Sequence, residues 1–134
     1  MKIHHIAYAV ADIDTARKKF EVLGYEVSQP VVTDSDRKIK IEFMTHAQSG
    51  LCIELVEPDG TPNPVDGYLE KSNGMSVPYH ICYETGDLEG AIAECRKNGF
   101  LPLQKPAPAT AIGGSRVAFL FSKDGGMIEL VESR

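Results

Sequence analysis

Hydrophobic and polar residues alternate in several short segments of the chain, and each segment is typical of a β-strand. The first is IHHIAYAV at 3–10, which is rich in strand-forming residues. YEVSQPVV at 25–32 is the second, and Pro30 marks it as an edge strand or a strand end. KIKIEFMT and LCIELVE follow as a hairpin around HAQSG. The first 58 residues therefore contain four predicted strands.

A helical pattern separates the first strand from the second. One face of this helix carries three apolar residues at helical spacing, Ala16, Phe20 and Leu23. Asp12 or Asp14 is suited to cap its first turn, and Gly24 suits the left-handed position at its end. The predicted order of elements is βαβββ.

The chain repeats this pattern after 75 residues. HIAYAVADIDTARKKFEVLGY aligns with HICYETGDLEGAIAECRKNGF, and GLCIELVE aligns with GGMIELVE at the same offset. Three distinctive pairs share the offset: His5 with His80, Gly24 with Gly99, and Glu54 with Glu129. Residues of three such different kinds rarely recur at one offset by chance. The sequence therefore predicts two copies of one supersecondary unit.

The predicted fold class is α+β, with two tandem βαβββ modules forming a curled, mostly antiparallel sheet around a metal cleft. Residues 1–134 form one domain, in which module one covers 1–58 and module two covers 78–134. The segment 59–77 is a Pro- and Gly-rich linker with one predicted helical turn. In module two we expect a strand at 78–84, a helix at about 88–98, and strands near 100–105, 115–121 and 126–132.

Strand alternation predicts which side chains share a face of the sheet. His5 lies on the same face as Ala7, whose small side chain leaves room in front of the sheet. Tyr8 lies on the opposite face, under the helix, and His4 is predicted to lie there too. Alternation in the fourth strand places Glu54 on the open face with His5.

The repeat adds His80 and Glu129 at the equivalent positions, so that two imidazoles and two carboxylates face the predicted cleft. Buried carboxylates repel one another unless a cation binds them. A lone His or Glu in a strand is more simply structural, but the recurrence of both at one offset favours a shared metal site. The donor set suits Zn, Ni, Co, Mn or Fe(II). Such an ion would polarise a carbonyl, and a ligand Glu would remove the neighbouring proton to give an enediolate.

Other polar residues carry weaker signals. Five are expected to be solvated: Arg17, Lys18, Lys19, Glu57 and Glu132. Three cations are candidates for recognising a carboxylate or phosphate near the cleft rim, namely Arg37, Lys105 and Arg116. Cys52 and Cys82 are expected to fill space rather than act as nucleophiles.

Charge and composition limit the classes of molecule that this protein is expected to bind. The net charge of −5 and the pI of about 5.3 disfavour nucleic acid and anionic membranes, which bind basic faces. No apolar run reaches the roughly 18 residues of a membrane-spanning helix, and MKIHHIAYAVADID does not resemble a signal peptide. The three cysteines show no CxxC spacing, which favours free thiols in a reducing cytoplasm. We expect a cytoplasmic protein that acts on a small molecule.

HHIAYAV, CIELVEP, YHICYE and GGMIELVE, in this order along the whole chain, resemble the vicinal oxygen chelate superfamily of glyoxalases, bleomycin resistance proteins and extradiol dioxygenases. The resemblance implies one divalent metal ion (Ni, Zn, Co or Mn) bound between two βαβββ modules. It implies four metal ligands, His5, Glu54, His80 and Glu129, and catalytic roles for Glu129 and Glu54. Because family members dimerise, we expect a homodimer, with modules pairing within a chain or across chains.

With Glu54 as a fourth ligand, the chain resembles bacterial glyoxalase I-like proteins. This implies a metal-dependent lactoylglutathione lyase, which isomerises the hemithioacetal of a 2-oxoaldehyde and a thiol to a 2-hydroxyacyl thioester through a metal-bound enediolate. One alternative is a methylmalonyl-CoA epimerase, whose second half typically carries GAHG…FLHPK where this chain has AIGGSRVAFLFSKDGG. An additional acid of the epimerase pattern falls near Arg37, with Glu42 as a nearby replacement. The other alternative is a non-catalytic drug-binding member.

Overall fold

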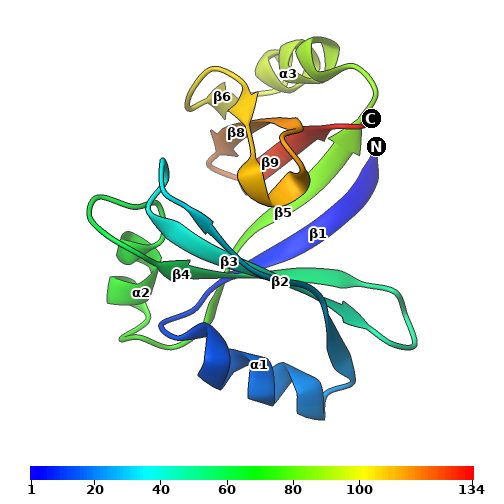
Figure 1. Ribbon diagram of the computed structural model, residues 1–134. Helices are drawn as coiled ribbons and strands as arrows, with labels where there is room; N and C mark the ends of the chain where they lie inside the picture. Colours follow the sequence, from blue (N-terminus) through cyan, green and yellow to red (C-terminus); the bar gives the residue numbers. More distant parts are fainter. The chain divides into compact units, whose positions relative to one another are not determined.

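The computed structural model describes all 134 residues, and the chain divides into two compact units (Figure 1). We call residues His5–Tyr79 the N-terminal unit. Residues Met1–His4 together with His80–Arg134 are the C-terminal unit. The division falls inside two strands, β1 (Lys2–Ala9) and β5 (Val77–Thr85), so each of them contributes residues to both units.

The N-terminal unit is a four-stranded sheet with a helix on one face (Figure 1). Its elements after β1 are α1 (Ile13–Val22), β2 (Tyr25–Asp34), β3 (Ile39–His46), β4 (Cys52–Pro58) and α2 (Asp66–Lys71). The strand order is β2-β3-β4-β1. The pairs β2–β3 and β3–β4 are antiparallel hairpins, whereas β1 runs parallel to β4. The short helix α2 confirms the helical turn predicted in the linker.

The C-terminal unit repeats this arrangement. Its elements are β5 (Val77–Thr85), α3 (Leu88–Lys97), β6 (Leu101–Pro102), β7 (Ala107–Pro108), a 3-10 turn (Thr110–Ile112), β8 (Arg116–Ser122) and β9 (Gly126–Glu132). The strand order is β5-β9-β8-β6, and β7 also pairs with β8. Here β5 runs parallel to β9, and the other pairs are antiparallel.

Each helix covers one face of the sheet in its own unit, because apolar side chains alternate onto that face. Under α1, the core comprises Val10, Ile13, Ala16, Met44, Ile53 and Leu55. Under α3, it comprises Leu88, Ala118, Leu120, Ile128 and Leu130. The opposite face of each sheet is therefore the one that carries the predicted site residues.

The helix ends follow the sequence prediction. Asp12 caps α1 by accepting a hydrogen bond from the backbone N–H of Thr15 at 2.9 Å, and Asp87 caps α3 in the same way. Gly24 and Gly99 follow the helices with φ angles of +101° and +90°, a conformation that residues with a Cβ rarely adopt.

Proline explains where the two units differ. The strand predicted near 100–105 is reduced to the two-residue strands β6 and β7, because Pro102, Pro106 and Pro108 have no N–H to donate to the sheet. In the N-terminal unit the single Pro30 lies on the edge strand β2. There the register shifts between Gln29 and Val32, and the strand continues.

The predicted fold class is confirmed: the chain is α+β, each unit follows the βαβββ plan, and the strands pair mostly antiparallel. None of the helices combines the length and the apolar character needed to cross a membrane.

Candidate functional site

In the N-terminal unit, His5 and Glu54 lie on the face of the sheet opposite α1. Strand β1 pairs with β4 so that Ala7 is opposite Glu54, and His5 lies two residues before Ala7 on the same face. Tyr8 and Leu55 alternate to the other face and pack in the core under α1. The predicted assignment of side chains to the two faces is confirmed for these residues.

The His5 imidazole and the Glu54 carboxylate form a buried pair. His5 Nε2 lies 3.5 Å from Glu54 Oε1, and the two side chains are 0% and 6% exposed. Phe43, which is opposite Glu54 on β3, presents its ring edge-on to His5 with the centroids 5.3 Å apart. The contacts with Phe43 and Glu54 together restrict the orientation of the imidazole.

The C-terminal unit contains the equivalent pair. His80 on β5 places Nε2 3.1 Å from Oε1 of Glu129 on β9, and the side chains are 2% and 6% exposed. Phe119, opposite Glu129 on β8, contacts the His80 ring edge-on at 5.2 Å. The phenylalanines are equivalent residues of the segments IEFM and VAFL, so the sequence contained a signal for them. That signal was not recognised as part of the site.

The geometry of each pair fits ligation of a metal ion. Two ligand atoms at about 2.1 Å from one ion are about 3.0 to 3.4 Å apart at octahedral or tetrahedral angles. The observed separations of 3.1 and 3.5 Å are close to this range. Imidazole nitrogen with carboxylate oxygen is a donor set for first-row divalent ions, and a bound cation offsets the cost of burying the carboxylates.

The structure thus brings the four predicted ligands together as two pairs, His5 with Glu54 in one unit and His80 with Glu129 in the other. Within each unit, the first strand of the module runs parallel to the last strand and lies next to it. This brings the His of the first strand beside the Glu of the last. The sharing of one ion by both pairs stays a prediction.

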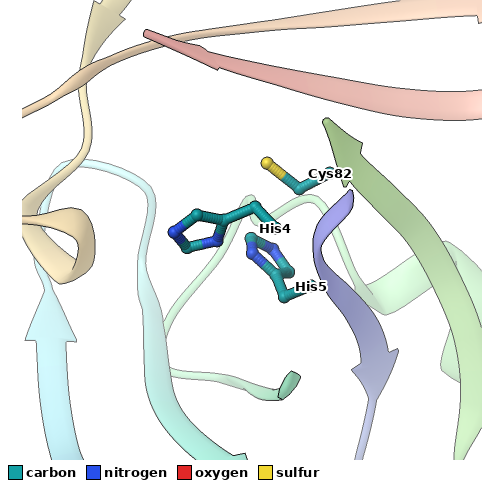
Figure 2. Close-up of side chains that lie close together, drawn as sticks. All are labelled: His4, His5 and Cys82. Atoms are coloured by element: carbon teal, nitrogen blue, oxygen red, sulfur yellow. The ribbon is translucent and has the colours of Figure 1, made fainter. Parts of the chain in front are cut away.

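His4 does not lie under α1, and that prediction was wrong. It belongs to the C-terminal unit, where it lies close to Cys82 of β5, as Figure 2 shows. The ligand atoms of these two residues are within 4.8 Å of each other. The prediction failed because the part of β1 before His5 extends past its paired region with β4, which begins at Ile6.

Glu42 does not replace the additional acid of the epimerase pattern that falls near Arg37, because it does not face the side of the sheet that carries Glu54. It is opposite Leu55 on β4 and therefore points to the α1 side of the sheet. Arg17 of α1 donates two hydrogen bonds to its carboxylate, at 2.7 and 3.0 Å. The expectation that Arg17 is merely solvated was wrong, because its guanidinium neutralises a carboxylate that is only 3% exposed.

Two other acids, Glu57 and Asp34, also have structural partners. Glu57 accepts a hydrogen bond from the backbone N–H of Ile13 at 2.8 Å and so supports the start of α1. Asp34 is buried at the end of β2, where Arg37 donates to it at 2.8 Å. Sequence reasoning missed Asp34, because only its register opposite Ile39 places it on the face that carries Glu54.

All three cysteines are free thiols. Burial, followed by the nearby Glu54 charge, raises the pKa of the Cys52 thiol above its usual value. Cys82 is fully buried beside Val117 and Val131. The raised pKa of Cys52 and the complete burial of Cys82 each make a poor nucleophile, which agrees with the predicted space-filling role.

Comparison with known proteins identifies the family. The family described as Glyoxalase/Bleomycin resistance protein/Dioxygenase superfamily matches residues 4–119. Ethylmalonyl-CoA/methylmalonyl-CoA epimerase from Cereibacter sphaeroides is 33% identical over 132 residues, which cover 96% of each chain.

Solved structures agree with this match. Methylmalonyl-CoA epimerase from Mycobacterium tuberculosis superposes with a TM-score of 0.84 at 26% identity, over 99% of this chain and 88% of that one. A variant of methylmalonyl-CoA epimerase from Streptomyces coelicolor, in complex with 2-nitronate-propionyl-CoA, gives a TM-score of 0.79 at 28% identity. That match covers 99% of this chain and 97% of the other.

These relatives correct the functional prediction. The sequence was interpreted as a glyoxalase I-type lactoylglutathione lyase, and this was wrong: the relatives are epimerases, one of them with an acyl-CoA analogue bound. The error has a chemical reason. The His and Glu ligands indicate removal of a proton beside a carbonyl, which both reactions require, and they carry no information about the thiol or the acyl group.

The family match covers most of the chain, and the structure contains the two buried His–Glu pairs and the repeated βαβββ plan. We conclude that the chain belongs to the glyoxalase/bleomycin resistance protein/dioxygenase superfamily.

Proposed function

We propose that this protein is an acyl-CoA epimerase that inverts the configuration at C2 of a 2-alkylmalonyl-CoA. The observation that carries the proposal is the 33% identity to an ethylmalonyl-CoA/methylmalonyl-CoA epimerase over 96% of both chains. The buried carboxylates Glu54 and Glu129 support it, because epimerisation needs groups that exchange a proton with carbon.

His5, Glu54, His80 and Glu129 would together hold one divalent ion of the group Ni, Zn, Co and Mn. Membership of the superfamily and the separations within the two pairs support this ligand set. When bound, the ion would supply a Lewis acid that polarises the thioester carbonyl and makes the C2 proton more acidic.

The two carboxylates would transfer the proton. In one direction Glu129 accepts the C2 proton as the C–H bond breaks and its electron pair moves into the thioester carbonyl. The electron pair then returns to C2 as a new C–H bond forms on the opposite face, with the proton supplied from Glu54. Glu54 starts protonated, and a forward turnover leaves it ionised and Glu129 protonated. The reverse reaction, or proton exchange of both groups with solvent between turnovers, restores the starting state, so no net proton is gained or lost. The burial of both carboxylates excludes water that would compete for the proton.

The test is epimerisation of one stereoisomer of methylmalonyl-CoA in D2O. NMR measures the replacement of the C2 proton by deuterium. The protein is loaded with each metal in a separate experiment. We expect Glu129→Gln and Glu54→Gln to lower the rate by about 100- to 10,000-fold, since each removes a proton-transfer group. Glu21→Gln, at an exposed position of α1, should retain the wild-type rate. Wild-type rates in both site variants, or no epimerisation by the metal-loaded wild type, would contradict the proposal.

A homodimer and a cytoplasmic location stay predictions. Light scattering during size-exclusion chromatography would measure the mass of the particle directly, and a mass near 14.6 kDa would exclude the dimer.

A further inference from the structure

An open groove of about 480 Å³ lies on the C-terminal unit. Its lining residues are Glu89, Ile92, Ala93 and Arg96 from α3, Lys105 and Pro106 from the segment between β6 and β7, and Arg116 from β8. The α3 residues recur at i, i+3, i+4 and i+7, so they form one continuous stripe along the helix. The structure therefore unites two of the three cations that sequence analysis considered for anion recognition, Lys105 and Arg116.

The groove lies on the α3 side of the sheet. Val117 is opposite Val131 and packs with it and Cys82, on the face that also carries His80. Arg116 is the next residue along β8, so its side chain emerges on the other face. The groove is thus separate from the His80–Glu129 pair, although both belong to the C-terminal unit.

The charges in the groove are not balanced. Arg116 donates to Glu89 at 2.7 Å and to Glu132 at 2.6 Å, so its charge is neutralised within the protein. The side chains of Arg96 and Lys105 have no ion pair or hydrogen bond, and both are exposed. In a chain with a net charge of −5, this groove therefore combines two uncompensated cations with the apolar side chains of Ile92, Ala93 and Pro106.

A ligand that fits this groove would carry a phosphate attached to a flat or apolar body. Arg96 and Lys105 would bind the phosphate, and Ile92 with Pro106 would contact the body. An acyl-CoA carries phosphates and an adenine at one end of a long flexible arm and its reactive thioester at the other. Its phosphates would therefore bind away from the residues that act on the thioester.

We propose that this groove binds the phosphorylated adenosine end of coenzyme A. The inference rests on the proposed acyl-CoA substrate, and it names the part of that substrate which the groove recognises.

Calorimetric titration with CoA, dephospho-CoA and inorganic phosphate tests the groove without any need for activity. We expect Arg96→Ala and Lys105→Ala each to weaken CoA binding by about ten-fold, since each loses a charged hydrogen bond. Lys97→Ala is the matched control, because Lys97 is exposed, adjacent to Arg96 and outside the groove. Equal weakening in all three variants, or in none, would overturn the proposal. Binding of inorganic phosphate without binding of CoA would overturn the choice of ligand.

Kinetics separates failure of the groove from failure of the proposed function. With methylmalonyl-CoA, Arg96→Ala and Lys105→Ala should raise KM by about ten-fold and leave kcat unchanged. With the same acyl group on N-acetylcysteamine, which has no phosphate, KM should not change. A similar rise with both substrates would reject the groove as the phosphate site. If the wild type does not turn over either substrate but calorimetry still shows binding of CoA that depends on Arg96, the groove stands and the epimerase proposal fails.

Discussion

At the scale of single residues, the partner of each buried acid decides what that acid does. Glu54 and Glu129 lie against the imidazoles of His5 and His80, the other two predicted ligands. Glu42 lies against a guanidinium, and so does Asp34. A carboxylate held by an Arg that is always charged has a structural role. A carboxylate beside an imidazole can still bind either a proton or a metal ion.

The Arg17–Glu42 pair yields a prediction about stability. Arg17→Met would leave the nearly buried Glu42 carboxylate without its cation, and we expect the free energy of unfolding to fall by about 2–4 kcal/mol. Lys18→Met, one residue further along α1 and exposed, should change it by less than about 0.5 kcal/mol. Urea unfolding of both variants measures the difference. Equal stabilities would show that the ion pair does not support the fold.

At the scale of elements, local sequence sets the limits of the two long helices, and charged pairs attach them to their sheets. Asp12 and Asp87 start these helices 75 residues apart, and Gly24 and Gly99 follow their ends at the same spacing. The attachments differ between the units. In the C-terminal unit, Arg116 on β8 binds both Glu89 on α3 and Glu132 on β9.

The attachment of α3 should depend on pH. Hydrogen bonds from Arg116 hold the pKa of both Glu89 and Glu132 below the ordinary value of 4.5. Because the folded pKa is lowered, these groups contribute stability above the ordinary pKa and lose it as pH falls through the folded value. Arg116→Met should therefore be less stable than wild type at neutral pH, and the difference should shrink below about pH 4.

Urea unfolding of wild type and Arg116→Met at a series of pH values measures this effect. Lys123→Met, which removes an exposed cation from the turn between β8 and β9, is the control and should show no such dependence. A stability difference for Arg116→Met that stays constant from neutral to acidic pH would mean that the two carboxylates do not stabilise the unit through Arg116.

At the scale of the whole molecule, each of the two units contains one His–Glu pair of nearly the same geometry. A single pair offers two ligands, which is fewer than transition-metal sites in proteins usually provide. If both pairs bind the same ion, loss of either pair should cause loss of the ion.

This predicts one ion per chain, with His5→Ala and His80→Ala each weakening its binding by about 100-fold or more. Inductively coupled plasma mass spectrometry after dialysis gives the stoichiometry, and calorimetry gives the affinity. Removal of the ion by a chelator should also lower the Tm, since binding stabilises the folded state by mass action. Two ions per chain, or wild-type affinity in either variant, would show that the pairs act separately.

Much of the fold could be predicted because it depends on local rules. Alternation identified the strands and the faces of His5 and Glu54, and the offset of 75 residues identified their counterparts. Register and neighbours could not be predicted in the same way. Only the pairing of Ile39 with Asp34 and of Leu55 with Glu42 shows that one of these acids shares the Glu54 face while the other points to α1.

The sequence by itself determined the repeated βαβββ plan, the helix ends and the four candidate ligands, because periodicity, capping and chemical type are properties of neighbouring residues. Tertiary structure decided which acid meets an imidazole and which meets an arginine, and where β1 leaves one unit for the other. It also gathered Arg96, Lys105 and Arg116 around one groove. These outcomes depend on contacts between residues far apart in the chain, and an isolated stretch of sequence does not specify such contacts.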